Sequence, residues 1–149
     1  MTYVLRYKTI IIIYLLCHEF SMSLKSKGIS AERELIHLFW KNKWAAHRIA
    51  GSGSSHYPSP DIIAGNVLRK VAIECKSSRS TTIYLEKREI DELKQFCALF
   101  GAEPWIAVRF LEEPWYVVNV EDLRETPAQY GVSLTLAKQK GLLFDEFIK

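Results

Sequence analysis

The strongest constraint on the fold lies between residues 60 and 76, where the sequence reads PDIIAGNVLRKVAIECK. Two short apolar runs flank a Gly-Asn step, a pattern that predicts a β-hairpin. Side chains alternate between the two faces of a strand, so Glu74 and Lys76 share one face while Cys75 points towards the core. Asp61 directly precedes the first run. We therefore expect two carboxylates and a lysine to converge at one edge of a sheet.

This combination of side chains suits metal-assisted hydrolysis of a phosphodiester. Carboxylate oxygens are preferred ligands of Mg2+, which shares its remaining positions with water and substrate phosphate. Lys76 would orient the nucleophile or offset the negative charge that develops on phosphorus. The alternative is a surface hairpin in which Glu74 and Lys76 form an exposed ion pair, a contact worth less than about 1 kcal/mol.

The distribution of charge favours a partner that carries phosphate groups. The net charge of the 149 residues is +3. Between Ser21 and Ile49, six basic residues face two acidic ones, whereas from Glu112 onward four basic residues face seven acidic ones. The basic half of the chain is also the half with the carboxylates of the hairpin, as a phosphate-binding enzyme requires.

The length fits a single domain, which we expect to span residues 22–149. Residues 1–21 are predicted to be an N-terminal extension outside this fold. Their apolar run, Ile10 to Cys17, is far shorter than the roughly 20 residues of a membrane helix, so we expect no membrane partner. A signal peptide is the less favoured alternative, because no small-residue cleavage site follows the run. The three cysteines show no Cys-x-x-Cys spacing, which favours a reducing compartment such as the cytoplasm.

Apolar periodicity and turn residues outline the other elements. Ser30 is the expected N-cap of the first helix, and Gly101 and Ser133 mark the end and the start of two later helices. Aromatic residues of the later strands are expected in the core, with base stacking as the alternative. The apolar tail, Leu142 to Ile148, would dock on a neighbouring element or a partner. The predicted helices cover Ala31–Lys43, Glu86–Phe100 and Ser133–Lys140, and the predicted strands cover Ala45–Ala50, Thr81–Leu85, Trp105–Phe110 and Trp115–Val120.

The order of these features resembles that of the archaeal Holliday junction resolvases. A glutamate on a helix is followed by a Gly-Ser loop and by the carboxylates and lysine of the hairpin, in the segments KGISAERELI, HRIAGSGSS, PDIIAG and AIECKS. The similarity runs from about Lys27 to Ile106 and continues more weakly to the end of the sequence. It implies an α/β fold of the restriction-endonuclease-like PD-(D/E)xK nuclease superfamily, with a mixed central β-sheet flanked by helices.

The resemblance also implies roles for individual residues. Lys76 would be the catalytic lysine, and Ser52 matches a loop serine that assists catalysis in the family. Arg33 and Arg48 match basic residues that bear on DNA binding or catalysis. Three carboxylates and one main-chain carbonyl would bind the metal, from Glu32, Asp61, Glu74 and Cys75. The residues expected to contact DNA are Lys27, Arg33, Arg48, His56 and Arg79.

These implications lead to a functional hypothesis. We expect a Mg2+-dependent endonuclease, with Mn2+ able to substitute, that acts as a homodimer and nicks two opposed strands of a four-way DNA junction. A clamp or helicase partner is a further possibility. One alternative is a restriction or repair nuclease of the same fold acting on duplex, flap or single-stranded DNA. Another is a junction-binding protein that does not cut.

Overall fold

The computed structural model describes residues 28–51 and 54–149. Three of the predictions concern residues outside these ranges: the N-terminal extension, the DNA contact of Lys27 and the catalytic role of Ser52. Residues Ala31–Lys149 form one compact unit.

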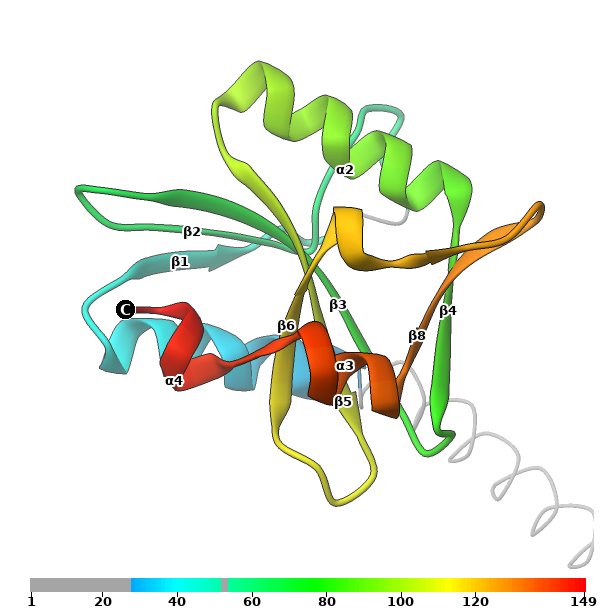
Figure 1. The fold of residues 1–149 in the computed structure, drawn as a ribbon. Coiled ribbons are helices and arrows are strands. Elements are labelled where there is room, and N and C mark those ends of the chain that lie inside the picture. The colour runs from blue at the N-terminus through cyan, green and yellow to red at the C-terminus, as the bar shows by residue number, and fades with distance from the viewer. Residues whose placement is uncertain (1–27, 52–53) are drawn as a thin grey trace, which may run out of the picture. The chain divides into compact units, whose positions relative to one another are not determined.

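Within the described residues, a six-stranded mixed sheet has the strand order β1-β2-β3-β5-β6-β9 (Figure 1). β3 pairs in parallel with β5, and the other neighbouring strands are antiparallel. Residues Val71, Ala72 and Ile73 of β3 are buried, as expected for a central strand covered on both faces. The predicted fold class is confirmed. The strands are β1 (Ala45–Arg48), β2 (Ile62–Gly65), β3 (Lys70–Ser78), β5 (Glu103–Phe110), β6 (Trp115–Asn119) and β9 (Leu142–Leu143).

A smaller antiparallel sheet of the described part has the order β4-β8-β7. Only β4 (Thr82–Glu86) was predicted from the sequence, with its bounds shifted by one residue. The two unpredicted strands are β7 (Arg124–Glu125) and β8 (Gln129–Ser133), which follow the 3-10 helix η2 (Val120–Asp122). This sheet supplies Ile83, Leu85 and Val132 to the core.

Helices cover both faces of the large sheet (Figure 1). The first helix spans residues 28–41, so the prediction of Ser30 as its N-cap was wrong, because the two preceding residues are already helical. Gly101 ends the second helix with a φ of 71°, and the Ser133 side chain accepts a hydrogen bond from the Leu136 N–H, both as predicted. The later helices are α2 (Lys87–Phe100), α3 (Leu134–Lys140) and α4 (Phe144–Phe147).

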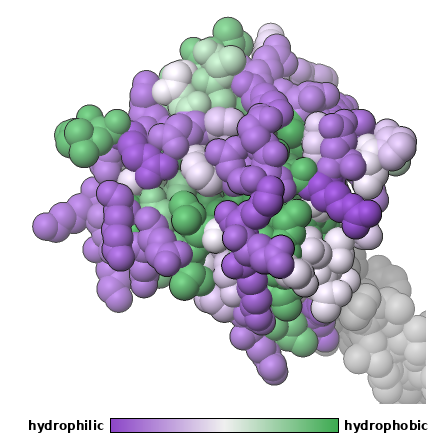
Figure 2. Space-filling model, viewed as in Figure 1, coloured by the Kyte–Doolittle hydropathy of each residue, from purple (hydrophilic) through white to green (hydrophobic). Residues whose placement is uncertain are grey.

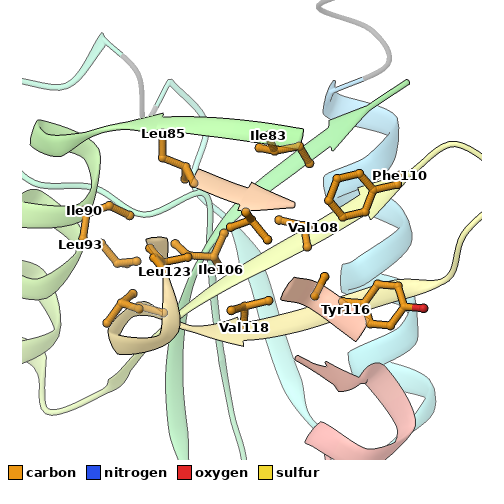
Figure 3. Packing of buried hydrophobic residues seen from close by; sticks show 14 of the residues in the cluster. Ile83, Leu85, Ile90, Leu93, Ile106, Val108, Phe110, Tyr116, Val118 and Leu123 are labelled. Atoms are coloured by element: carbon orange, nitrogen blue, oxygen red, sulfur yellow. The ribbon is translucent and has the colours of Figure 1, made fainter. Parts of the chain in front are cut away.

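Two apolar clusters hold these layers together. On one face, Ile90 and Leu93 of α2 pack against Ile106 and Val108 of β5 and against β4 (Figure 3). On the other face, Leu35 and Phe39 of the first helix pack against buried residues of β2, β3 and β6. The central sheet is therefore covered on both faces.

Part of the apolar tail docks on its own chain. Phe144 and Phe147 of α4 are buried. The Phe39 ring lies 5.0 Å from the Phe144 ring, and the Trp105 ring lies 5.0 Å from the Phe147 ring. Trp115 is also buried, so the core interpretation of the strand aromatics is correct.

Hydrophobic residues also reach the surface at one end of the sheet. The turn between β2 and β3 carries Val67 and Leu68, which are almost fully exposed, and Figure 2 shows this apolar tip at the left edge of the molecule. None of the helices in residues 28–51 and 54–149 has both the length and the apolar character that crossing a membrane requires.

Candidate active site

The β2–β3 hairpin forms as predicted and brings Asp61 next to Glu74. Ile62 lies opposite Ile73 in the antiparallel pair, so the residue before Ile62 adjoins the residue after Ile73. Asn66 closes the turn, because its side-chain oxygen accepts hydrogen bonds from the N–H groups two and three residues further on, both at 2.8 Å. This turn fixes the register that pairs the two carboxylates.

A pocket of about 250 Å³ opens beside this pair of carboxylates. The hairpin supplies one wall, and the first turns of α2 supply another. Acidic side chains dominate the lining, with Lys76 as the cation among them. The acidic lining residues are Glu32, Asp61, Glu74, Glu89 and Glu92.

Asp61 is held between the two strands of the hairpin. Its Oδ2 accepts a hydrogen bond of 2.9 Å from the Cys75 N–H. The Cys75 side chain packs against the apolar cluster on the face of the first helix, as the strand alternation predicts. Burial raises the pKa of the Cys75 thiol, with the neighbouring carboxylates adding to the effect. The thiol therefore stays protonated, and Cys75 contributes its main chain to the site.

Lys76 lies between two carboxylates from different elements. Its Nζ is 3.0 Å from Glu74 Oε1 and 2.6 Å from Glu89 Oε1. Glu89 Oε2 also accepts a hydrogen bond of 2.8 Å from the Glu86 N–H, the N-cap of α2. One carboxylate thus joins the start of α2 to the lysine of the hairpin.

Glu89 and Glu92 were not predicted from the sequence as residues of the site. Their helix was predicted, but its docking onto the hairpin depends on contacts distant in the sequence. The available pattern was Glu86-x-x-Glu89, a capping pair that starts α2 directly after β4. It places Glu89 in the first turn of the helix without indicating which other element this side chain approaches.

Burial and like charge govern the protonation of the pocket. Burial raises the pKa of Glu74 to about 8, and the charge of Asp61 adds to this effect. Burial lowers the pKa of Lys76, but Glu74 and Glu89 outweigh it and leave that pKa well above its ordinary value. The lysine is protonated, and the pocket still holds more negative than positive groups.

Glu32 approaches the same pocket from the first helix, where it pairs with Arg48. The Arg48 Nε donates a hydrogen bond to Glu32 Oε2, and the Glu32 side chain is only 15% exposed. Arg48 is the last residue of β1, so this ion pair ties the helix to the edge of the sheet. Three of the acidic residues of the pocket are therefore paired with two cations: Glu32 with Arg48, and Glu74 and Glu89 with Lys76.

The residues of the pocket fit a divalent cation by their chemistry. No three His, Cys, Asp or Glu side chains of the described residues are placed to hold a metal, and Glu32 is paired with Arg48 and Glu74 with Lys76. The pocket nevertheless offers several hard oxygen donors, the type that Mg2+ and similar ions prefer. Burial and the charge of Asp61 raise the pKa of Glu74, and a bound cation would favour the ionised carboxylate.

The predicted DNA contacts within the described residues are not among the residues that line this pocket. Arg33 on the first helix, His56 in the loop before β2 and Arg79 in the turn after β3 are all exposed. Arg48 is partly buried by its ion pair with Glu32. The structure thus unites the predicted metal and lysine positions in one pocket, and it leaves three of the predicted DNA contacts on the surface.

Comparison with known proteins gives a consistent result. A family model described as archaeal Holliday junction resolvase (Hjc) matches residues 23–149. The chain is 37% identical over 130 residues to crossover junction endodeoxyribonuclease Hjc of Archaeoglobus fulgidus, covering 83% of this chain and 96% of that protein. It is 37% identical over 114 residues to crossover junction endodeoxyribonuclease Hje of Sulfolobus acidocaldarius, covering 73% of this chain and 81% of that protein.

A solved structure shows the same fold. The structure of Archaeoglobus fulgidus Hjc, described as a Holliday junction resolvase from an archaeal hyperthermophile, matches with a TM-score of 0.75 and 33% sequence identity. The match covers 82% of this chain and 95% of that chain. The similarity therefore extends over almost the whole of the solved protein.

Proposed function

The chain belongs to the archaeal Holliday junction resolvase family, and we propose that it resolves four-way DNA junctions by paired, symmetric nicks in opposed strands. Its relatives are named crossover junction endodeoxyribonucleases, which supports endonuclease activity on this branched DNA. The observation that carries the proposal is the pocket in which Asp61, Glu74 and Lys76 meet on one hairpin. Carboxylates and a lysine so placed suit hydrolysis of a phosphodiester.

The family implies a divalent metal, and we assign it to the acidic pocket as Mg2+, with Mn2+ able to substitute. Four residues would hold it through oxygen atoms: Glu32, Asp61, Glu74 and, through its main-chain carbonyl, Cys75. The bound cation would supply Lewis-acid polarisation of the scissile phosphodiester. Glu32 would leave Arg48 to join this set, which frees the Arg48 guanidinium for a DNA phosphate.

Lys76 is the proposed catalytic lysine, and Glu89 is its positioning residue. The two carboxylates at 2.6 and 3.0 Å keep the ammonium protonated and restrict its position. An ammonium held beside the phosphodiester stabilises the negative charge that develops during attack and can orient the attacking water. Glu89 would act through Lys76, because its carboxylate contacts the ammonium group. The same carboxylate also caps the start of α2.

Basic residues around the pocket are proposed to hold the DNA. The exposed positions of Arg33, His56 and Arg79 support this assignment. Lys27 and Ser52 lie outside the described residues, and their roles, in DNA contact and in catalysis, rest on the sequence pattern alone.

Paired nicks in opposed strands require two sites, and this supports a homodimer. An isologous interface would relate the two pockets by the same twofold axis that relates the two cuts. We also propose recruitment by a clamp or a helicase, and a cytoplasmic location at the nucleoid. The nuclease domain is assigned to residues 22–149, supported by the family model that matches from residue 23.

The test is cleavage of a labelled immobile four-way junction in Mg2+, with excess linear duplex as competitor and with the cuts mapped on all four strands. We expect paired symmetric nicks that disappear when the metal is chelated. Preferential cutting of the linear duplex would assign duplex DNA as the substrate and leave the assignment of the active site unchanged. Tight junction binding without cutting in Mg2+ or Mn2+ would overturn the assignment as a nuclease.

A further inference from the structure

The outer face of the first helix carries a stripe of exposed cationic and aromatic residues. Arg33, His37 and Trp40 follow one another at intervals of four and three residues, so they lie on one face of the helix. All three are exposed, whereas Leu35 and Phe39 point into the core. We call Arg33, His37, Trp40, Lys41, Lys43 and His47 the outer stripe.

Trp40 is a fixed part of this surface although the residue is 54% exposed. Its Nε1–H donates a hydrogen bond of 2.9 Å to the Ala46 carbonyl on the edge strand β1. The His47 ring lies edge-on to it, with the ring centroids 6.4 Å apart. An exposed indole that is held in one orientation loses little conformational entropy when a partner packs against it.

The charge of the outer stripe is uncompensated. Among residues 28–51 and 54–149, no ion pair is formed by Arg33, Lys41 or Lys43. By contrast, Lys138 and Lys140 of α3 are paired with Glu113 and Asp122. The sequence contains no Asp or Glu between Glu34 and Asp61. This surface therefore complements a partner with dense negative charge.

The outer stripe is continuous with the candidate active site. Glu32, which lines the pocket, directly precedes Arg33 on the same helix. Lys41 lies nine residues beyond Glu32, which corresponds to roughly 13 Å along the helix at about 1.5 Å per residue. At about 3.4 Å per base pair, this length spans about four base pairs of duplex.

We propose that the outer stripe holds one arm of the four-way junction by its sugar-phosphate backbone, over about four base pairs beyond the cleavage site. The inference rests on the proposed function. Arg33, Lys41 and Lys43 would face phosphates, and the indole of Trp40 would pack against the sugars between them. DNA is favoured over an acidic protein, because the stripe starts beside the pocket that acts on the same backbone.

The test compares junction binding by wild-type protein with that by the double variant Lys41→Gln/Lys43→Gln. Each lost phosphate contact lowers the slope of log Kd against log salt concentration by about 0.9, so we expect a total decrease of about 1.8. Lys138→Gln/Lys140→Gln is the matched control, because it removes the same charge from paired residues of α3, and its slope should equal that of the wild type. An unchanged slope in the stripe variant, or an equal decrease in the control, would overturn the inference.

A second measurement locates the contact on the DNA. Junctions with neutral methylphosphonates three to five base pairs from the cut should weaken wild-type binding and abolish the difference between wild type and stripe variant. If wild type and stripe variant still differ in their affinity for this DNA, the assignment to a junction arm is overturned. A changed sedimentation coefficient of the free stripe variant would also overturn it, because that change would indicate that the stripe forms a contact between copies of the chain. Thermal unfolding verifies that both variants are folded. Failure of wild-type protein to bind or cut junctions would instead overturn the proposed function.

Discussion

Lys76 and Glu89 meet at 2.6 Å although they come from a hairpin strand and from a helix that follows another strand. The same Glu89 carboxylate caps α2 by accepting a hydrogen bond from the Glu86 N–H at 2.8 Å. The position of the lysine and the start of the helix are thus set by one side chain.

Glu89→Gln should slow cleavage while junction binding is retained. The amide keeps the shape and one acceptor but loses the charge that holds the ammonium, and a charge-assisted hydrogen bond contributes roughly 1.5 to 3 kcal/mol. We expect the single-turnover rate to fall about tenfold or more. Glu92→Gln is the matched control, because Glu92 lines the same pocket but pairs with Arg88. Equal rates for Glu89→Gln and wild type would contradict a positioning role.

Asp61→Asn and Glu74→Gln should each abolish cleavage and leave junction affinity close to that of wild type. Both substitutions preserve size and remove a carboxylate proposed to hold the metal, while asparagine can still accept the hydrogen bond that the Cys75 N–H donates to Asp61. Gel-shift titrations in Ca2+ and cleavage assays in Mg2+ measure the two properties separately. Cleavage by either variant at the wild-type rate would remove that residue from the site.

The metal-free protein should lose stability as the pH rises from about 5 to about 8. The folded state keeps a proton on Glu74 up to a pKa of about 8, whereas the ordinary pKa is 4.5. The folded state therefore binds more protons than the unfolded state in this window, and stability falls with rising pH. Thermal unfolding in EDTA should show that Glu74→Gln removes this contribution. A stability difference between the two proteins that does not vary with pH would contradict the assignment.

Arg48→Ala should destabilise the protein, and adding Glu32→Gln should restore most of the loss. The Glu32 carboxylate is largely buried beside Arg48, and a buried group left without its partner costs about 1 to 3 kcal/mol or more. Removing its charge relieves that cost. Urea unfolding of the two single variants and the double variant gives the coupling energy. Strict additivity would show that the ion pair contributes nothing to the fold.

Phe147→Ala should cost about 3 to 5 kcal/mol, the range for phenylalanine removed from a core. Phe147 is 1% exposed and its ring contacts Phe39, Trp44 and Trp105. Leu99→Ala, at a position that is 84% exposed, is the control and should have little effect. Similar unfolding midpoints for the two variants would show that α4 is not part of the core.

Local features of the sequence predicted much of this structure. The hairpin that carries Asp61 and Glu74 follows from residues close in the chain, and so do the helix ends at Gly101 and Ser133. β8 was missed because its sequence, QYGVS, combines a glycine with no clear alternation, and its pairing with β4 spans a long separation.

In the candidate site, too, local sequence predicted some residues, and contacts between distant segments determine the others. Glu32, Asp61, Glu74 and Lys76 follow from a motif in order along the chain, and the structure places all four in one pocket. The contact of Glu89 with Lys76 and that of Arg48 with Glu32 depend on how helices dock against the sheet. Single-sequence patterns carry no information about such docking, so these partners emerged only from the three-dimensional arrangement.

The central strand β3 pairs with one strand that is close in sequence, β2, and with one that is remote, β5. This difference determines the order in which the parts of the pocket form. The pairing of β3 with β2 needs only a tight turn, whereas its parallel pairing with β5 needs the whole crossover through β4 and α2. Short loops close faster than long ones. The carboxylates of the hairpin can therefore come together early in folding, but Lys76 gains its second carboxylate partner, Glu89, only when α2 docks. A local opening of α2 would inactivate the pocket while the hairpin persisted.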